Sequence, residues 1–200
     1  MSAYEPPYLF NTNLDTIPSS KSYLFANDDK IISWEKRLIK PTFKIGICWQ
    51  GGTFNTGVGR DFPLSLFEDI SKLPHVELIS LHKGDGEKQI QDITFDLTTL
   101  GNHFDAGENS FLDTAAVMVN CDLIISSDTS ITHLAGALGC LIWVPLKKIP
   151  EWRWMLDRTD SPWYPNMTLY RQKDFGDWKH VFERIKRDLV PLIKQDERIK

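Results

Sequence analysis

Short apolar runs alternate with segments of helical periodicity from residue 43 onward. The runs are rich in β-branched residues, which is typical of buried strands. Strands are predicted over Phe43–Trp49, Val76–Leu81, Leu123–Ser126, Leu141–Val144 and Met167–Tyr170, with a weak one over Ile93–Leu97; helices are predicted over Pro63–Leu73, Gly84–Ile90, Phe111–Asn120, Asp128–Leu138 and Asp177–Ile193. Because the strands are apolar on both faces, this alternation predicts an α/β fold, a Rossmann-like parallel sheet with helices on both faces.

The first 42 residues follow a different pattern. They contain Pro6, Pro7, Pro18 and Pro41. An irregular arm is predicted up to about Tyr23, followed by a helix over Asp28–Ile39 that ends before Pro41. The sequence therefore divides into an arm with a short helix, residues 1–42, and an α/β domain, residues 43–200.

Charge and composition exclude several classes of protein. The net charge is −4 and no Lys/Arg tract stands out, which speaks against a nucleic-acid partner. No apolar run reaches the roughly 20 residues of a membrane span, and the N-terminus lacks the pattern of a signal peptide. Cys48, Cys121 and Cys140 are too widely spaced for a disulfide scaffold or a zinc ribbon, and no His/Cys/Asp cluster has metal-ligand spacing. A cytoplasmic protein without a metal site is the resulting expectation.

The sharpest local signal is the junction of the strand Leu123–Ser126 with the following helix. Thr129 and Ser130 stand at the start of that helix, and His133 lies one turn later on the face of Thr129. The first N–H groups of a helix lack partners within the helix and favour an anion, so this junction predicts a phosphate cradle. The alternative is that Asp128 is an ordinary N-cap and His133 a half-buried packing residue.

Two further strand-to-helix turns could contribute. Gly51 begins a glycine-rich loop that ends at Arg60, a side chain able to reach a phosphate or a sugar. The loop matches neither the dinucleotide pattern nor the P-loop, and it could instead be a mobile surface loop. Glu87, after the second strand, could accept hydrogen bonds from a ribose, or could simply complement the dipole of its own helix.

Aromatic residues gather after the last strands, at Trp152, Trp154, Trp163 and Tyr164. They could form a wall for a sugar, but structural anchors are the favoured interpretation, because each indole buries a large area.

The motifs together resemble a known family. The matching segments are Tyr8–Phe10, Leu14–Pro18, Ile47–Gly51, Ser80–Gly84, Asp113–Ala116, Ser126–Ser130, His133–Gly139, Trp152–Trp154, Asp160–Pro165 and Gly176–Trp178. This set resembles the C-terminal region of bacterial tetratricopeptide-repeat proteins that end in a glycosyltransferase-like domain. Those proteins are related to the heptosyltransferases of glycosyltransferase family 9 and, more distantly, to O-linked N-acetylglucosamine transferases.

The resemblance implies the C-terminal half of a GT-B fold, the half that binds a nucleotide diphosphate sugar without a metal or other cofactor. By the resemblance, Asp128 contacts the donor sugar, Thr129 and Ser130 contact the diphosphate, and His133 lies in the same site. Glu87 holds the ribose, Arg60 stands near the phosphates, and the Asp113–Ala116 turn lies against the base. The implied donor-binding set comprises Asp128, Thr129, Ser130, His133, Glu87, Arg60, Gly51, Lys83, Asp113 and Thr114.

The family's N-terminal half, which holds the acceptor site and the catalytic base, has no counterpart in this chain. The hypothesis is therefore a donor-binding half that transfers sugar only with that half or a partner, so that catalysis by the chain alone stays open and its catalytic residues unknown. The alternatives are a non-catalytic nucleotide-sugar binding or assembly module, and a structural domain with a vestigial pocket. Without its partner, the arm and the last helix are expected to expose apolar surface and to cause self-association.

Overall fold

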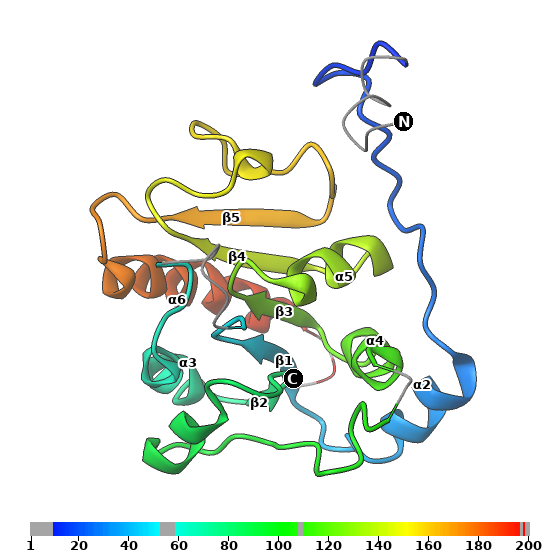
Figure 1. The fold of residues 1–200 in the computed structure, drawn as a ribbon. Coiled ribbons are helices and arrows are strands. Elements are labelled where there is room, and N and C mark those ends of the chain that lie inside the picture. The colour runs from blue at the N-terminus through cyan, green and yellow to red at the C-terminus, as the bar shows by residue number, and fades with distance from the viewer. Residues whose placement is uncertain (1–9, 53–58, 108–109, 197, 199–200) are drawn as a thin grey trace.

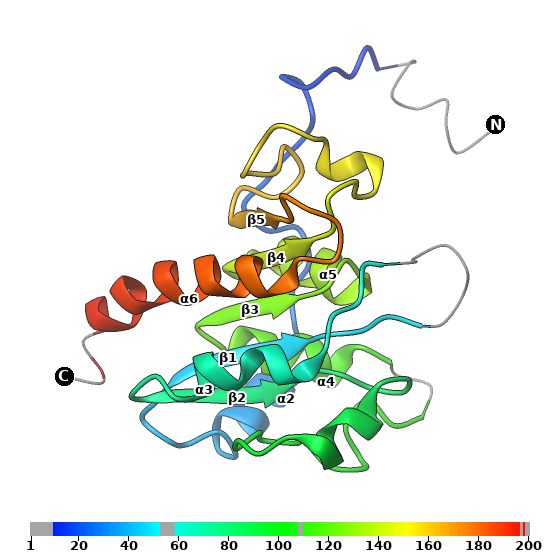
Figure 2. The ribbon, with the colours of Figure 1, turned by 90° about the vertical axis from the view of Figure 1, so that its left-hand side faces the viewer.

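The structure is a computed structural model that describes residues 10–52, 59–107, 110–196 and 198. Within these residues the centre of the fold is a five-stranded sheet in the order β2-β1-β3-β4-β5 (Figures 1 and 2). The strands are β1 (Phe43–Cys48), β2 (Val76–Ser80), β3 (Leu123–Ser126), β4 (Ile142–Leu146) and β5 (Met167–Arg171). Every neighbouring pair is parallel. The predicted α/β fold with a parallel sheet is confirmed.

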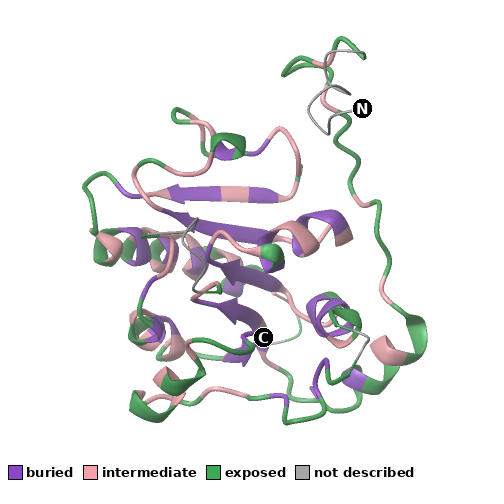
Figure 3. Cartoon of the chain, in the orientation of Figure 1, coloured by how far each residue is buried: buried purple, intermediate pink, exposed green. Residues whose placement is uncertain are grey.

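Helices cover both faces of the sheet. One face packs against α2 (Asp28–Glu35), α4 (Leu112–Val119) and α5 (Ser130–Leu138). The other packs against the 3₁₀ helix η1 (Leu64–Phe67), α3 (Glu68–Ser71) and α6 (Trp178–Gln195). The remaining 3₁₀ helices are η2 (Glu87–Asp92) and η3 (Trp152–Trp154). The strands between the two layers are almost wholly buried (Figure 3), as their apolar sequences require.

Side-chain alternation along β1 separates the two cores. Ile45 and Ile47 point into the core that contains α6, and Cys48 points into the core that contains α4. Gly46 faces the core that contains α4, where a Cβ atom would lie 2.8 Å from the side chains of both Ile124 and Leu81. A side chain at residue 46 would therefore force these two core residues apart.

Several predicted elements differ from the structure. The segment Ile93–Leu97 is no strand; the chain meets β2 only at Thr98, through a single bridge to Ile79, so the prediction of a third strand is wrong. Most of the predicted helix Pro63–Leu73 is 3₁₀ helix and a single α turn. Its buried residues Leu64, Phe67 and Ile70 recur every three positions, the spacing that a 3₁₀ helix places on one side.

Two other elements are shorter or tighter than expected. The predicted helix Gly84–Ile90 is the 3₁₀ helix η2, because the preceding residue, Gly86, is left-handed. The first helix, α2, ends at Glu35 and not at Ile39, since the chain turns there so that Leu38 can be buried while Ile39 stays exposed.

The arm follows the outer side of α5 before it enters α2 (Figure 1). The backbone N–H groups of Tyr23 and Leu24 both donate to the carbonyl of Ala137, at 2.9 and 3.1 Å. Gly139, with a φ of 78°, ends α5 where a Cβ atom would lie 2.6 Å from the carbonyl oxygen of Lys21. The arm is thus attached by backbone hydrogen bonds at a position where α5 carries no side chain.

The last helix does not expose apolar surface, and that part of the expectation is wrong. Val181, Phe182, Ile185, Leu189 and Ile193 of α6 are buried against the sheet, because they form one stripe of an amphipathic helix. The arm does expose large apolar side chains, including Phe10, Leu14 and Phe25. Among the described residues, no helix combines the length and apolar character needed to cross a membrane.

Candidate functional site

A cavity of about 400 Å³ opens where the chain leaves β1. In the sheet order, β2 lies on one side of β1 and β3 on the other, so the connections after β1 and β3 diverge and leave a crevice between them. The predicted residues that line this cavity are Gly51, Arg60, Lys83, Thr114, Thr129 and Ser130. A second cavity of about 300 Å³ shares Arg60, Thr129 and Ser130 with the first and adds Asp128 and His133. The topology thus brings together residues from four separate segments.

The start of α5 lies between the two cavities. Thr129 is its N-cap, in extended conformation with φ −139°, and its side chain caps none of the helix N–H groups described. Thr132, in the first turn, donates its hydroxyl back to the carbonyl of Ser127 at 2.8 Å. The alternative in which Asp128 is the N-cap is therefore wrong. The positive end of α5 remains available to an anion from the cavities.

The carboxylate of Asp128 is held in an environment that disfavours its charge. Burial raises its pKa above the ordinary value, while the indole N–H of Trp154, His133 and Arg60 act in the opposite direction without cancelling the effect. The indole N–H of Trp154 is buried and makes no hydrogen bond of ordinary geometry with any described residue. A carboxylate with such a raised pKa suits proton exchange or hydrogen bonding to a sugar hydroxyl.

His133 is held by aromatic side chains from the loop after β4. Its ring stacks on Trp154, with centroids 5.3 Å apart, and its Nδ1 lies 3.1 Å from the hydroxyl of Tyr164. Burial lowers the pKa of His133, so the imidazole is neutral near pH 7. Gly136 permits this arrangement, because a Cβ there would lie 2.5 Å from the Tyr164 ring. The loop after β4 thus approaches α5 closely at Gly136.

Arg60 lies over Gly51, where a Cβ atom would come within 2.4 Å of its Nη2. The backbone N–H of Gly51 donates to Asp61 at 2.9 Å, so this donor is already used. Arg60 lines both cavities, and its ion pair with Asp61 among the described residues is long, at 3.9 Å. Most of the glycine-rich loop, residues 53–58, lies outside the described residues, so its predicted contribution is known only at its two ends.

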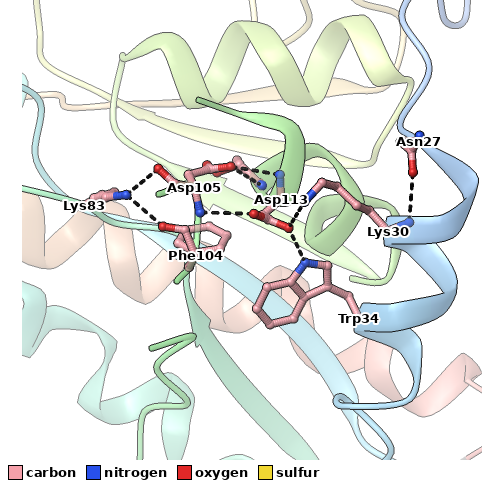
Figure 4. Close-up of polar contacts among 8 residues, drawn as sticks. Asn27, Lys30, Trp34, Lys83, Phe104, Asp105 and Asp113 are labelled. Atoms are coloured by element: carbon pink, nitrogen blue, oxygen red, sulfur yellow. Dashed lines mark hydrogen bonds and ion pairs between the residues drawn. The ribbon is translucent and has the colours of Figure 1, made fainter. Parts of the chain in front are cut away.

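A polar network joins the wall of the larger cavity to α2 (Figure 4). The ammonium of Lys83 donates to the carbonyls of Phe104 and Asp105, at 2.7 and 2.6 Å. The carboxylate of Asp105 accepts from the N–H groups of Asp113 and Thr114 and from the Thr114 hydroxyl. The Thr114 hydroxyl and the Lys83 ammonium, both predicted to bind the donor, are thus already bonded within the protein.

Asp113 completes this network from the other side. It accepts from Lys30 at 2.8 Å, from the Trp34 indole at 2.9 Å and from the backbone N–H of Asp105 at 3.2 Å. Burial opposes its ionisation, but these three donors together hold its pKa below the ordinary value. In the described structure its carboxylate faces α2, and Asp113 is not among the residues that line either cavity.

Glu87 lies apart from the start of α5. It lines a third cavity, of about 720 Å³, which also includes Lys83 and Phe104. Its carboxylate accepts from the backbone N–H of Gly84 at 3.1 Å and remains exposed. Lys83 borders both this cavity and the one at α5, so an extended ligand could pass from one to the other.

Sequence reasoning missed a buried pair on the cavity wall. Nδ1 of His82 lies 3.5 Å from the sulfur of Cys48, and the His82 ring stacks on Trp49 at 4.1 Å. His82 Nε2 faces the carbonyl of Asp85, which can only accept, so Nε2 carries the proton and Nδ1 accepts from the thiol. Burial raises the pKa of Cys48 to about 11 and lowers that of His82, so the pair is neutral. The pairing could have been predicted from the sequence, because Cys48 lies at the end of one predicted strand and His82 follows the next one.

The aromatic cluster is divided between structural and exposed positions. Trp154 is fully buried in the core, as the structural interpretation predicts, whereas Trp152 is 65% exposed. Trp163 contacts Trp152 edge-on and donates its indole N–H to the carbonyl of Arg153 at 3.1 Å. Within the described residues, no group of three or more His, Cys, Asp or Glu side chains could hold a metal ion.

Comparisons with known proteins identify similar sequences and similar folds. No protein-family model matches the sequence. The chain is 27% identical to Protein FlbA of Caulobacter vibrioides over 179 residues, which make up 86% of this chain and 29% of that protein. The name of this relative does not describe an activity.

Solved structures are informative about the fold. A glycosyl transferase family 9 protein from Veillonella parvula aligns with a TM-score of 0.63 and 10% identity, over 89% of this chain and 56% of that one. The ADP-heptose LPS heptosyltransferase II of Escherichia coli aligns with a TM-score of 0.59 and 14% identity, over 87% and 54%. The chain has the fold of about half of a family 9 glycosyltransferase.

A third solved structure has a similar fold. Heptosyltransferase WaaC of Escherichia coli, with ADP-2-deoxy-2-fluoro heptose, aligns with a TM-score of 0.56 and 12% identity, over 76% of this chain and 44% of that one. The chain therefore spans about half of these enzymes and less than a third of FlbA. The resemblance to GT-B glycosyltransferases is confirmed for the fold, while the link to tetratricopeptide-repeat proteins stays a prediction.

Proposed function

We propose that the chain binds a nucleotide diphosphate sugar as the donor-binding half of a GT-B glycosyltransferase. The observation that carries this proposal is the start of α5, which lies between two adjoining cavities and has no side-chain cap among the described residues. A diphosphate at this position would receive backbone N–H groups, the hydroxyls of Thr129 and Ser130, and the guanidinium of Arg60. The family 9 fold supports the proposal by analogy.

The two cavities fit the two ends of such a donor. The nucleoside occupies the larger cavity, and the sugar occupies the smaller one, beside Asp128 and His133. During transfer the sugar–phosphate bond breaks and the bond electrons remain with the diphosphate, which gains negative charge. The helix start and Arg60 would stabilise that charge as it develops. His133, neutral at pH 7, would serve as a hydrogen-bonding group and not as a fixed cation.

Transfer requires an acceptor and a base that accepts its proton. We propose that an N-terminal GT-B half or a partner chain supplies both, as in the family that the sequence resembles. We also propose that the diphosphate needs no metal ion, because the helix start and Arg60 already provide positive charge.

The decisive experiment measures binding of ADP, UDP, GDP, CDP and their sugars by thermal shift, first with EDTA and then with Mg²⁺. A ligand at a hundred times its Kd adds about 2.7 kcal/mol, which raises Tm by roughly 5–10 °C in a protein of this size. At least one diphosphate should give this shift without Mg²⁺. Arg60→Ala and Thr129→Ala should weaken its binding about ten-fold, because each removes a contact to charge.

A matched control keeps this experiment specific. Arg187, 71% exposed on α6, is also an arginine beside an aspartate but lies among none of the cavity residues described, so Arg187→Ala should bind as the native protein does. The proposal is wrong if no nucleotide shifts Tm, or if Arg187→Ala weakens binding as much as Arg60→Ala.

A non-catalytic nucleotide-sugar binding module is the second candidate. Lys83 and Thr114, predicted to bind the donor, are already bonded to Phe104 and Asp105, so part of the predicted donor-binding set has a role within the protein itself. Sugar transfer measured after addition of the missing half would exclude it, whereas binding without transfer would favour it.

A further inference from the structure

Phe111 has an unusual backbone conformation and lines the cavity of about 400 Å³ beside α5. It is the N-cap of α4, with a left-handed backbone at φ 71°, and it lines the cavity while 43% exposed. A bulky residue with positive φ is a rare outlier, because this conformation carries an energetic cost. A large apolar ring would normally offset such a cost by burial, which does not happen here.

Backbone hydrogen bonds hold the turn of α4 that follows Phe111. The carbonyl of Phe111 accepts from the N–H of Ala115 at 2.9 Å, in the first turn of α4. The carboxylate of Asp105 binds the N–H groups of Asp113 and Thr114. Lys83 in turn holds the carbonyls of Phe104 and Asp105. The residues that follow Phe111 at the start of α4 thus belong to a network that reaches α2 through Asp113 (Figure 4).

The two helix starts at this cavity differ in a way that orients a ligand. The positive end of α4 is already neutralised by the Asp105 carboxylate, so a phosphate there would meet an anion. The start of α5 has no such carboxylate cap among the described residues. The charged part of a ligand therefore belongs at α5, and the part that reaches α4 and Phe111 is uncharged and offers a flat surface to an aromatic ring.

We infer that Phe111 is the platform on which the base of a nucleoside diphosphate stacks, a specificity residue for the aromatic end of the ligand. The inference rests on the proposed function. It separates two tasks in one cavity: α5 and Arg60 bind the diphosphate, and Phe111 distinguishes a nucleotide from inorganic pyrophosphate. Since every base has a π face, Phe111 strengthens binding of all four nucleoside diphosphates to a similar degree.

The test compares binding of a nucleoside diphosphate with binding of inorganic pyrophosphate in four proteins. Phe111→Gly removes the ring, and glycine accepts the left-handed backbone, so this variant should unfold at the native Tm or above. Its affinity for the nucleotide should fall about ten-fold, while its affinity for pyrophosphate stays unchanged. Phe111→Leu keeps an apolar side chain without a ring and should also bind the nucleotide weakly. Phe111→Tyr keeps the ring and should restore binding.

The outcomes distinguish failure of this inference from failure of the proposed function. If the native protein binds no nucleotide, both are wrong. If it binds with the expected dependence on Arg60 but Phe111→Gly binds equally well, only the inference on Phe111 is wrong. Equal loss of nucleotide and pyrophosphate in Phe111→Gly, or full affinity in Phe111→Leu, would also overturn it, because stacking would then not be the cause.

Discussion

At the scale of the residue, the carboxylate of Asp128 lowers the stability of the folded protein at neutral pH. Its pKa is raised mainly by burial, so the folded protein favours the protonated carboxyl relative to the unfolded chain. The stability that this group contributes is present below its unfolded pKa of about 3.9 and is lost as the pH rises through the folded pKa. At neutral pH, Asp128 is therefore a destabilising charge.

Asp128→Asn should consequently raise Tm at pH 7, by about 2 °C, because the amide keeps the shape of the side chain and removes the charge. The gain should vanish below about pH 4, where the native carboxyl is protonated in both states. Asp174→Asn, at an exposed position, is the matched control and should leave Tm unchanged. Thermal unfolding across pH 3–8 measures this, and a lower Tm for Asp128→Asn at pH 7 would contradict it.

Site residues could be predicted to lie together when they are close in the sequence. Asp128, Thr129, Ser130 and His133 were predicted together because one strand-to-helix junction contains them all, and they line one cavity. The pairing of Cys48 with His82 joins two strands and was missed. The engagement of Lys83 with Phe104 and Asp105 was missed for the same reason, since no local pattern indicates which distant carbonyl an ammonium will reach.

At the scale of the element, the carboxylate of Asp113 links α4 to α2 and to the loop at Asp105. It accepts from Lys30 and Trp34 of α2 and from the backbone N–H of Asp105. Although burial opposes its charge, the donors lower its pKa, so its contribution to stability is present above the unfolded pKa and is lost as the pH falls through the folded pKa.

Asp113→Asn should lower the free energy of unfolding at pH 7 by about 1 kcal/mol, since the amide still accepts a hydrogen bond but loses the attraction of Lys30. The loss should shrink as the pH falls towards 3. Urea unfolding at several pH values measures it. Asp160→Asn, which breaks an exposed pair with Arg158, should lower the free energy of unfolding much less. Equal losses in the two variants would contradict the stabilising role of the link to α2.

Elements were predicted best where the apolar pattern was long and buried on both sides. The strands of the sheet and the helices α4, α5 and α6 lie close to their predicted positions. The failures lie at the edge of the sheet, where Thr98 alone meets β2, and in short segments whose threefold spacing suits a 3₁₀ helix. There tertiary contacts, and not local periodicity, determine the conformation.

At the scale of the whole molecule, exposed apolar side chains concentrate on the arm and on the loops after β4 and β5. Phe10, Leu14 and Phe25 are respectively 80%, 56% and 86% exposed, and Phe175 is 73% exposed. Large apolar side chains grouped in this way are typical of surfaces that associate.

The chain should therefore self-associate through the arm, which light scattering over a range of concentrations measures. Phe25→Ser should shift the distribution towards the monomer, because it removes the most exposed ring of the arm. Phe175→Ser removes a ring of comparable exposure in the loop after β5 and should not change the distribution. A native protein that stays monomeric at high concentration would contradict this prediction.

The direction of α6 has a practical consequence for all of these experiments. The helix begins beside the loops that follow the strands and runs back across the sheet, so that Arg198 reaches Asp122, immediately before β3 (Figure 2). The described C-terminal end thus lies at the end of the sheet where the strands begin, opposite the cavities. An affinity tag or a linker to a sensor chip attached there would leave the cavity mouths unobstructed, and a fluorophore at that end would report on tumbling of the molecule without competing with a ligand.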